Sequence, residues 1–377
     1  LSTNNNSKIE KEFLTSKLPK DLIKKLKLIL RHMKYPLAIR SSSLLEDSQY
    51  KPLAGMYKTF MLPNANKKTE PRLNQLSEAI KRVYASTFYK EPKALMDSVS
   101  QRYEEEKMAI IIMELIGKNH DNTFYPTFSG VCQSYNYYPV SHMDRKDGVA
   151  FLALGLGKTV ADGEKSLRYS PKYPEILPQY YSVKSAINNS QNKFYALDLK
   201  NEKELLYKGE EGNLNKYDLE VAERHNELKH IANVVINEDN IIRESLKYKG
   251  PRVLTFSSII KYNYFPLNSI LNEFIKQGEN FIGCPFEIEF AVNIHSKKKS
   301  EFCLLQVKPM AIDNIDNDIN ILKISSSKST FCFSKQVLGD GSFDKIKHIV
   351  YIDINKFQRE KTQTIADKIG LVNKKLG

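Results

Sequence analysis

The sequence has no tryptophan, only four cysteines and no long apolar run. The cysteines lie far apart, and none has a C-x-x-C partner. They are Cys132, Cys284, Cys303 and Cys332. This spacing favours buried thiols in a reducing compartment over a disulfide framework or a zinc site. The longest apolar runs, residues 108–113 and 149–156, fall short of the roughly 20 residues that a membrane-spanning helix needs. We therefore expect a cytoplasmic protein without a membrane span.

The composition is that of a folded chain with a basic balance. It contains 41% hydrophobic and 27% charged residues, and 377 residues correspond to roughly two or three packed units. The formal net charge of +13 raises the possibility of a nucleic-acid partner. The lysines are spread along the chain, however, with local bursts only around Lys24 and at residues 297–299, and no aromatic stacking motif accompanies them. Solvated surfaces explain this pattern better than a nucleic-acid site does.

Apolar periodicity predicts a mixture of helices and strands. A rhythm of about 3.6 residues predicts helices over residues 19–33, 72–88 and 219–235. Short apolar runs predict strands over residues 36–39, 55–62, 125–135 and 149–154. The apolar run 108–116 predicts a strand covered on both faces.

Residues 286–309 contain two alternating runs separated by a polar turn, which predicts a β-hairpin. Alternation places Glu287 and Glu289 together on one face, and Gln306 and Lys308 together on the return strand. Carboxylate and amide oxygens suit Mg²⁺, which is usually held by one or two carboxylates together with phosphate oxygens and water. On spacing alone, an ordinary amphipathic hairpin with Glu and Lys paired across its wet face remains the favoured interpretation.

A second group of polar residues begins where the apolar strand 36–39 ends at Arg40. A planar guanidinium with five donors suits a triphosphate. Gly55 allows a close approach of the backbone to a ligand, and Thr59 adds a hydroxyl on the next strand. Taken alone, a plain strand, turn and strand explains these residues at least as well.

The glycine-rich stretch at residues 153–159 resembles a phosphate-binding loop but does not match one. A Walker A loop requires glycine where this sequence has Leu152, and a dinucleotide motif requires glycine where it has Val160. A tight strand-to-helix turn and a turn that donates N–H groups to an anion both remain open.

Taken in order, these segments resemble the N-terminal domain of the pyruvate phosphate dikinase, phosphoenolpyruvate synthase and rifampin phosphotransferase family. The resemblance covers residues 35–310, most of the chain. The matching stretches are Ala38-Ile39-Arg40-Ser41-Ser42 with Glu46-Asp47, residues 55–60 and 110–116, Phe128-Ser129-Gly130-Val131, Leu154-Gly155-Leu156-Gly157, Glu287-Ile288-Glu289-Phe290 and Leu305-Gln306-Val307-Lys308-Pro309.

The resemblance implies an α+β chain with an ATP-grasp fold, in which two subdomains enclose ATP. It places Arg40, Thr59 and Lys308 at the phosphates, Gly55 against the nucleotide and Met113 at the adenine side. It assigns Mg²⁺ to Glu289 and Gln306, with Glu287 close by. We expect residues 1–19 to be disordered or a linker, residues 20–310 to form the nucleotide-binding domain, residues 311–320 to be a linker, and residues 321–377 to form a small α/β unit with strands near residues 331 and 349–352.

In this family ATP is usually split to AMP, and a phosphoryl group passes to a histidine on a swivelling domain. The resemblance therefore implies an ATP-dependent phosphotransferase of the kinase type, with Arg40 and Lys308 as its catalytic cations. No glycine-, threonine- and serine-rich histidine motif is present, and histidines such as His120 and His225 lie in polar segments typical of a surface. The acceptor histidine is therefore expected on a further domain of a longer polypeptide.

Three departures from the family pattern leave an alternative open. Met113 stands where the family has glutamine, Lys308 stands where it has arginine, and no Gly-Lys-Gly-type motif precedes Lys20. Either the sequence is a piece of a longer phosphotransferase, or it is a catalytically silent ATP-binding sensor or scaffold.

Overall fold

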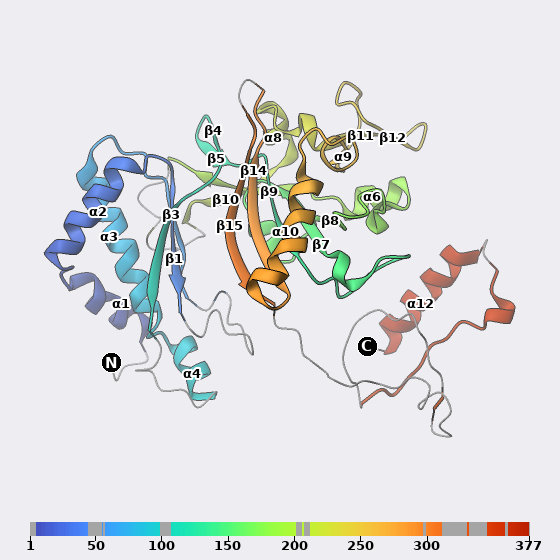
Figure 1. Ribbon diagram of the computed structural model, residues 1–377, viewed down its shortest axis with the longest axis horizontal. Coiled ribbons are helices and arrows are strands. Elements are labelled where there is room, and N and C mark those ends of the chain that lie inside the picture. Colours follow the sequence, from blue (N-terminus) through green and yellow to red (C-terminus); the bar gives the residue numbers. More distant parts are fainter. Residues whose placement is uncertain are drawn as a thin grey trace. The chain divides into compact units, whose positions relative to one another are not determined.

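The computed structural model describes residues 5–43, 55, 57–98, 107–200, 206, 212–296, 299–310, 330–331, 345–358 and 361–376. The chain divides into two compact units, Leu1–Ile312 and Asp313–Gly377 (Figure 1). Helices and several small sheets occur together, in agreement with the predicted α+β class. Among the described residues, every helix is too short or too polar to cross a membrane.

The N-terminal part of the first unit is a three-stranded antiparallel sheet covered by helices on one face (Figure 1). The strand order is β2 (Phe60–Leu62), β1 (Leu37–Ser42) and β3 (Ala109–Glu114). Helices α2 (Lys20–His32) and α3 (Thr69–Ser86) pack on the sheet, α1 (Asn6–Thr15) packs against α3, and α4 (Lys90–Ser98) follows α3. Leu37 and Ile39 pack with Leu26 of α2 and Leu76 of α3. Because side chains alternate along a strand, Ala38 and Arg40 lie on the opposite face.

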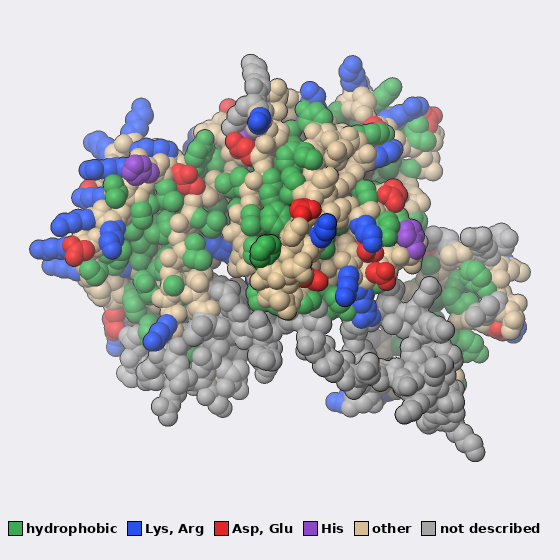
Figure 2. Space-filling view, viewed as in Figure 1, with side chains coloured by type: hydrophobic (Ala, Val, Ile, Leu, Met, Phe, Trp, Pro, Cys, Tyr) green, Lys and Arg blue, Asp and Glu red, His purple; other side chains and the backbone are tan. Residues whose placement is uncertain are grey.

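Helix α2 explains much of the chain's basic appearance. Its buried stripe includes Leu26 and Leu30, whereas Lys20, Lys24 and Lys25 are exposed. Lys and Arg side chains gather at the side of the molecule where α2 lies, at the left of Figure 2. The lysines are the solvated face of an amphipathic helix.

The described residues of the rest of the first unit form three further antiparallel sheets around a shared core. Their strand orders are β15-β14-β6-β7-β8, β10-β9-β5-β4 and β12-β11-β13. The strands are β4 (Lys118–His120), β5 (Thr123–Tyr125), β6 (Phe128–Gln133), β7 (Val149–Leu154), β8 (Leu167–Tyr169), β9 (Lys193–Asp198), β10 (Leu214–Asp218), β11 (Ala232–Ile236), β12 (Ile241–Arg243), β13 (Arg252–Leu254), β14 (Phe286–Asn293) and β15 (Glu301–Pro309).

In the described part of this region, five helices accompany the sheets, and three short 3₁₀ turns connect them. The helices are α5 (Lys158–Ala161), α6 (Val183–Asn189), α8 (Leu219–Arg224), α9 (Ser257–Ile260) and α10 (Leu267–Ile282). The 3₁₀ turns are η2 (Arg145–Asp147), η3 (Pro178–Tyr180) and η5 (Leu228–His230). Leu267 and Leu271 of α10 belong to the same core as Phe286 and Phe290 of β14. The described cysteines, Cys132, Cys284 and Cys303, are free thiols.

Three sequence-based expectations for the first unit are wrong. The predicted helix 219–235 ends at Arg224, because Asn226 adopts the left-handed conformation at φ 60° and a β-branched stretch then forms β11. Strand β3 is not covered on both faces, since Ile111, on the sheet face that carries Arg40, is 47% exposed. Residues 6–15 of the expected linker are helix α1, which the side chain of Asn5 caps and Ile9 anchors.

The second unit contains η6 (Ile354–Lys356) and helix α12 (Thr362–Leu376). The strand predicted at residues 349–352 is wrong. Among the described residues of this unit no second strand pairs with that stretch, and Tyr351 is 77% exposed. Phe331 is also not in a strand, and the expected linker at residues 311–320 lies outside the described residues.

Gly278 in the middle of α10 provides a test of this packing. A Cβ atom there would overlap the ring of Phe286, the first residue of β14. Gly278→Ala should therefore destabilise the protein by about 1–3 kcal/mol, although alanine favours an isolated helix by about 1 kcal/mol. Urea unfolding measures the difference, with Gly370→Ala in α12, where nothing lies within 4 Å of the added atom, as the control. Equal or greater stability of Gly278→Ala would contradict the packing.

Candidate functional site

Hairpin β14–β15 forms with the predicted alternation. Glu287 lies opposite Lys308, and Glu289 lies opposite Gln306, so all four side chains share one face. Phe286, Ile288 and Phe290 point to the other face and are buried in the core. A bulge follows Glu289, where the register shifts before Phe290 pairs with Leu304.

Charged groups are closely matched on the outward face of the hairpin. The Nζ atom of Lys308 lies 2.8 Å from Oε1 of Glu287 and 3.6 Å from Oε1 of Glu289. The other oxygen of Glu287 accepts a hydrogen bond of 2.7 Å from Nε2 of Gln133 on β6. Burial disfavours the ammonium charge, but the hydrogen bonds and charges of Glu287 and Glu289 outweigh it and raise the pKa of Lys308. Lys308 is therefore a fixed cation beside two carboxylates.

Arg40 connects this face to the N-terminal sheet. Its Nη2 donates a hydrogen bond of 3.1 Å to Oε1 of Gln306, and its Nη1 lies 3.7 Å from Oε2 of Glu289. The side chains of Arg40 and Glu289 are 35% and 27% exposed, so solvent screens the pair, which should contribute no more than about 1 kcal/mol. So weak a contact can be exchanged for stronger contacts to an anionic ligand.

The other predicted site residues are Met113, which lies on the same sheet as Arg40, and Gly55 and Thr59, which precede strand β2 of that sheet in the chain. Met113 lies opposite Ala38, on the sheet face that carries Arg40. Thr59 is half-buried immediately before β2, and Gly55 is exposed with φ 80° and open space around it. The contacts of the described residues bring together Arg40 and the hairpin but do not include Gly55 or Thr59. Glu46 and Asp47 lie outside the described residues.

The donor set fits a magnesium ion that is completed by a phosphate ligand. The described residues contain no group of three or more His, Cys, Asp or Glu side chains arranged to hold a metal. The hairpin instead offers two carboxylates and one amide oxygen on one face, from Glu287, Glu289 and Gln306. Mg²⁺ commonly takes only one or two carboxylates and obtains its remaining oxygens from phosphate and water.

The glycine-rich stretch after β7 is a close-packed strand-to-helix turn. A Cβ on Gly155, whose φ is 82°, would meet the carbonyl oxygen of Tyr195 at 2.6 Å. The N–H of Leu156 donates to the same carbonyl, and Ser129 Oγ donates to the Gly155 carbonyl. Glycine is therefore required at position 155 by packing alone.

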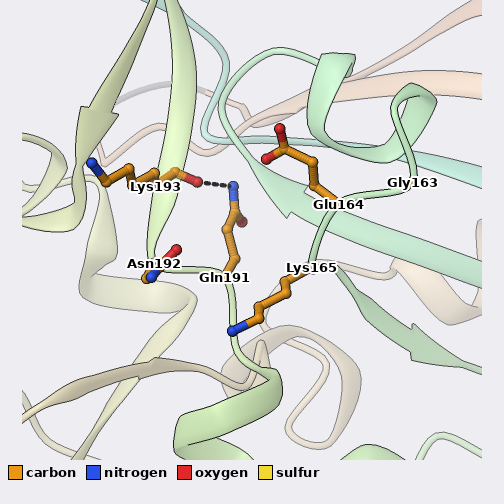
Figure 3. Close-up of a pocket in the computed structure, with 6 residues that line it drawn as sticks. All are labelled: Gly163, Glu164, Lys165, Gln191, Asn192 and Lys193. Carbon is orange, nitrogen blue, oxygen red and sulfur yellow. Dashed lines mark hydrogen bonds between the residues drawn. The ribbon is translucent and has the colours of Figure 1, made fainter. Parts of the chain in front are cut away.

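Two surface cavities lie away from the hairpin. The first, of about 360 Å³, is lined by Gly163, Glu164, Lys165, Gln191, Asn192 and Lys193 (Figure 3). Its only deeply buried amide, Gln191, already bonds both the N–H and the carbonyl of Leu154 and the carbonyl of Lys193. The second, of about 640 Å³, includes the Glu223–Arg252 ion pair. In both cavities the strongest polar groups are already partnered, so neither replaces the hairpin as the candidate site.

His120, His225 and Tyr125 form a cluster that the sequence did not predict. His120 and His225 stack with ring centroids 4.8 Å apart, and Tyr125 Oη lies 2.8 Å from Nδ1 of His225. The expectation that His120 is a surface residue is wrong, because its side chain is only 12% exposed. The residues lie on β4, on β5 and beside α8, so only long-range folding brings them together. No spacing in the sequence could have signalled this.

Lys118 joins that cluster to the hairpin. Its Nζ pairs with the buried carboxylate of Glu227 and donates a 3.0 Å hydrogen bond to the carbonyl of Ile294, just after β14. Thr127 Oγ1 donates to the second oxygen of Glu227 at 2.7 Å. The end of β14 is therefore held by a buried charge pair.

The fold and the site together define an α+β module in which an arginine from one sheet meets an acidic hairpin of another. The family model described as pyruvate phosphate dikinase, AMP/ATP-binding domain, matches residues 2–329, and the chain belongs to this family. The resemblance seen in the sequence is thereby confirmed. No curated protein matches the sequence.

The His120 cluster predicts an acid-sensitive stability. Burial is the main cause that lowers the pKa of His120 to about 4; the Glu227 charge opposes this shift, and His225 and Lys118 add to it. The unfolded chain therefore binds more protons between pH 6.5 and about 4, and stability should fall by up to about 3 kcal/mol as the pH decreases through that window. Unfolding free energies of the natural chain and His120→Gln, measured across this range, should show a flatter profile for the variant. Parallel profiles would contradict the assignment.

Proposed function

We propose that this chain is the ATP- and Mg²⁺-binding module of a dikinase-type phosphotransferase, with an ATP-grasp arrangement of two parts around the nucleotide. The observation that supports this most is the contact of Arg40 with Glu289 and Gln306. Arg40 lies more than 200 positions from Glu289 and Gln306 in the sequence, yet the three residues present a cation and oxygen donors at one place. That combination suits a metal-bound triphosphate.

Each residue of the site then has a separate task. Glu289 and Gln306 hold Mg²⁺, with Glu287 beside them, and the ion neutralises charge on the phosphates. Arg40 and Lys308 bind phosphate oxygens, and Gly55 and Thr59 complete the phosphate side from the segment before β2. Met113 borders the adenine, on the same face of the N-terminal sheet as Arg40.

The proposed reaction splits ATP into AMP and two phosphoryl groups. One phosphoryl group passes to a histidine on a further domain, and the other passes to water and leaves as inorganic phosphate. Such transfers need little covalent help from the protein, and catalysis is mainly positioning and neutralisation of charge. Lys308 suits the second task, since Glu287 and Glu289 keep it protonated. Arg40 supplies a planar guanidinium that can bind two phosphate oxygens at once.

A silent ATP-binding sensor is the second candidate. Lys308 occupies the place of the family's arginine and is already paired with Glu287 at 2.8 Å. An ammonium cannot reproduce the bidentate phosphate contact of a guanidinium. Binding of ATP without transfer would follow if that contact is essential.

Binding tests the proposal first. MgATP should raise the melting temperature of the natural chain, and Arg40→Met and Glu289→Gln should each weaken MgATP binding about 10- to 100-fold, because each loses a charged contact. Titration calorimetry measures the affinities. Arg243→Met, which removes an exposed arginine on β12, is the matched control and should bind as the natural chain does. Absence of any MgATP effect, or unchanged affinity in both site variants, would refute the proposal.

Product analysis separates the transferase from the sensor. A longer polypeptide that carries a histidine domain should form AMP from ATP, and Lys308→Met should reduce the rate at least about 10-fold while Lys308→Arg retains it. Chromatography of the nucleotides measures AMP. Tight ATP binding with no AMP from any of the three proteins would favour the silent sensor.

A further inference from the structure

Asn293, the last residue of β14, has a buried oxygen without a partner. The residue is 3% exposed, and its Oδ1 has no hydrogen-bond partner in the part of the chain that the structure describes. Its Nδ2 faces two acceptors, the carbonyl of Gly117 at 3.5 Å and Oε2 of Glu301 at 3.4 Å. A buried acceptor that lacks a donor is destabilising, and such atoms in folded proteins commonly have a functional explanation.

The strand geometry places Asn293 on the same face as the candidate site. Side chains alternate along β14, so Asn293 shares a face with Glu287, Glu289 and Ala291, and this face is buried at Ala291 and Asn293. It lies four residues beyond Glu289, a distance of about 13 Å along the strand. An extended ATP molecule spans a comparable length between its terminal phosphates and the amino group of its adenine.

Two contacts fix the direction in which a nucleotide would lie. Arg40 meets Glu289 and Gln306 at the metal end of the hairpin, and Asn293 meets Gly117 at the other end. Gly117 belongs to the segment that leads from β3 to β4. The phosphates and the base should therefore follow the strand from Glu289 toward Asn293.

The side chains between these two ends are apolar. Ala291 pairs with Cys303 across the hairpin. Ile111 and Met113 of β3 lie on the same face of the N-terminal sheet as Arg40. Ile111 is 47% exposed, although it is a large hydrophobic residue. Apolar walls with a few placed polar groups are typical of sites for flat heterocycles.

We propose that Oδ1 of Asn293 accepts a hydrogen bond from the exocyclic amino group of adenine and thereby selects ATP over GTP. The inference rests on the proposed function, because it assigns the base-reading residue of the same site. Asn293 is covered in this structure, so its neighbours must shift for the base to reach it. Once there, the amino group supplies the donor that the oxygen lacks.

The orientation of the Asn293 amide favours adenine over guanine. Guanine presents a carbonyl oxygen where adenine has its amino group, so Asn293 would have to turn its Nδ2 toward the base to bind guanine. That rotation would bring Oδ1 against the Gly117 carbonyl and the Glu301 carboxylate, which are both acceptors. A site built around a hydrogen bond rejects the analogue that cannot form it.

Comparison of ATP with purine riboside triphosphate, which lacks only the amino group, isolates this contact. The natural chain should bind ATP about 10-fold more tightly, as expected for one hydrogen bond to a buried acceptor. In Asn293→Leu the preference should fall to about one, through weaker binding of ATP. Asn233→Leu, at a buried asparagine on β11, should keep the 10-fold preference and serves as the control.

The outcomes distinguish this inference from the proposed function. ATP binding with an unchanged preference in Asn293→Leu would overturn the inference and leave the proposed function standing. No binding of either triphosphate by the natural chain would overturn both. If Asn293→Leu does not fold, Glu301→Gln at the exposed edge provides the test: removal of the carboxylate charge should reduce the preference for ATP over GTP, and an unchanged preference would contradict the inference.

Discussion

The approach of the Arg40 guanidinium to Glu289 and Gln306 is the interaction on which the rest of the site depends. It joins a sheet whose other face is packed against α2 and α3 to a hairpin whose other face is buried in the main core. Each partner is positioned by its own hydrophobic packing, so the polar groups need not stabilise the fold. Because the contact is partly exposed and weak, a ligand with several negative charges can replace it at little cost.

Charge balance on the hairpin sets what the site can accept. Among the described residues, Glu287 contacts Lys308 and Gln133 closely, whereas the cations near Glu289 lie at 3.6 and 3.7 Å. Glu289 is therefore held more loosely than Glu287, and under the proposed function it would be the better metal ligand of the two. Glu287 helps to keep Lys308 charged. Beyond Glu289 the same face of β14 continues, buried, through Ala291 to Asn293, so this face changes from acidic to apolar to amide along the strand.

The hairpin could be predicted from the sequence because a strand's period of two is a local property. Alternation alone gave the faces of Glu287, Glu289, Gln306 and Lys308, and the buried pattern from Leu37 to Ile39 placed Arg40 at a strand end. No local pattern placed Arg40 near the hairpin; only the family resemblance assigned both to one ATP site. The His120–His225 stack and the link from Lys118 to Ile294 were not predictable, since they join segments that meet only in the folded chain. The predicted helix at residues 219–235 failed because Asn226 and tertiary pairing of β11 override helical periodicity.

A crystal structure with Mg²⁺ and a non-hydrolysable ATP analogue tests the central claim most directly. We expect the metal to bind Glu289 and Gln306, the guanidinium of Arg40 to contact the phosphates, and the base to lie toward Asn293. A nucleotide bound elsewhere, such as in the cavity beside Gln191, with the contact of Arg40 and the hairpin unchanged, would contradict it.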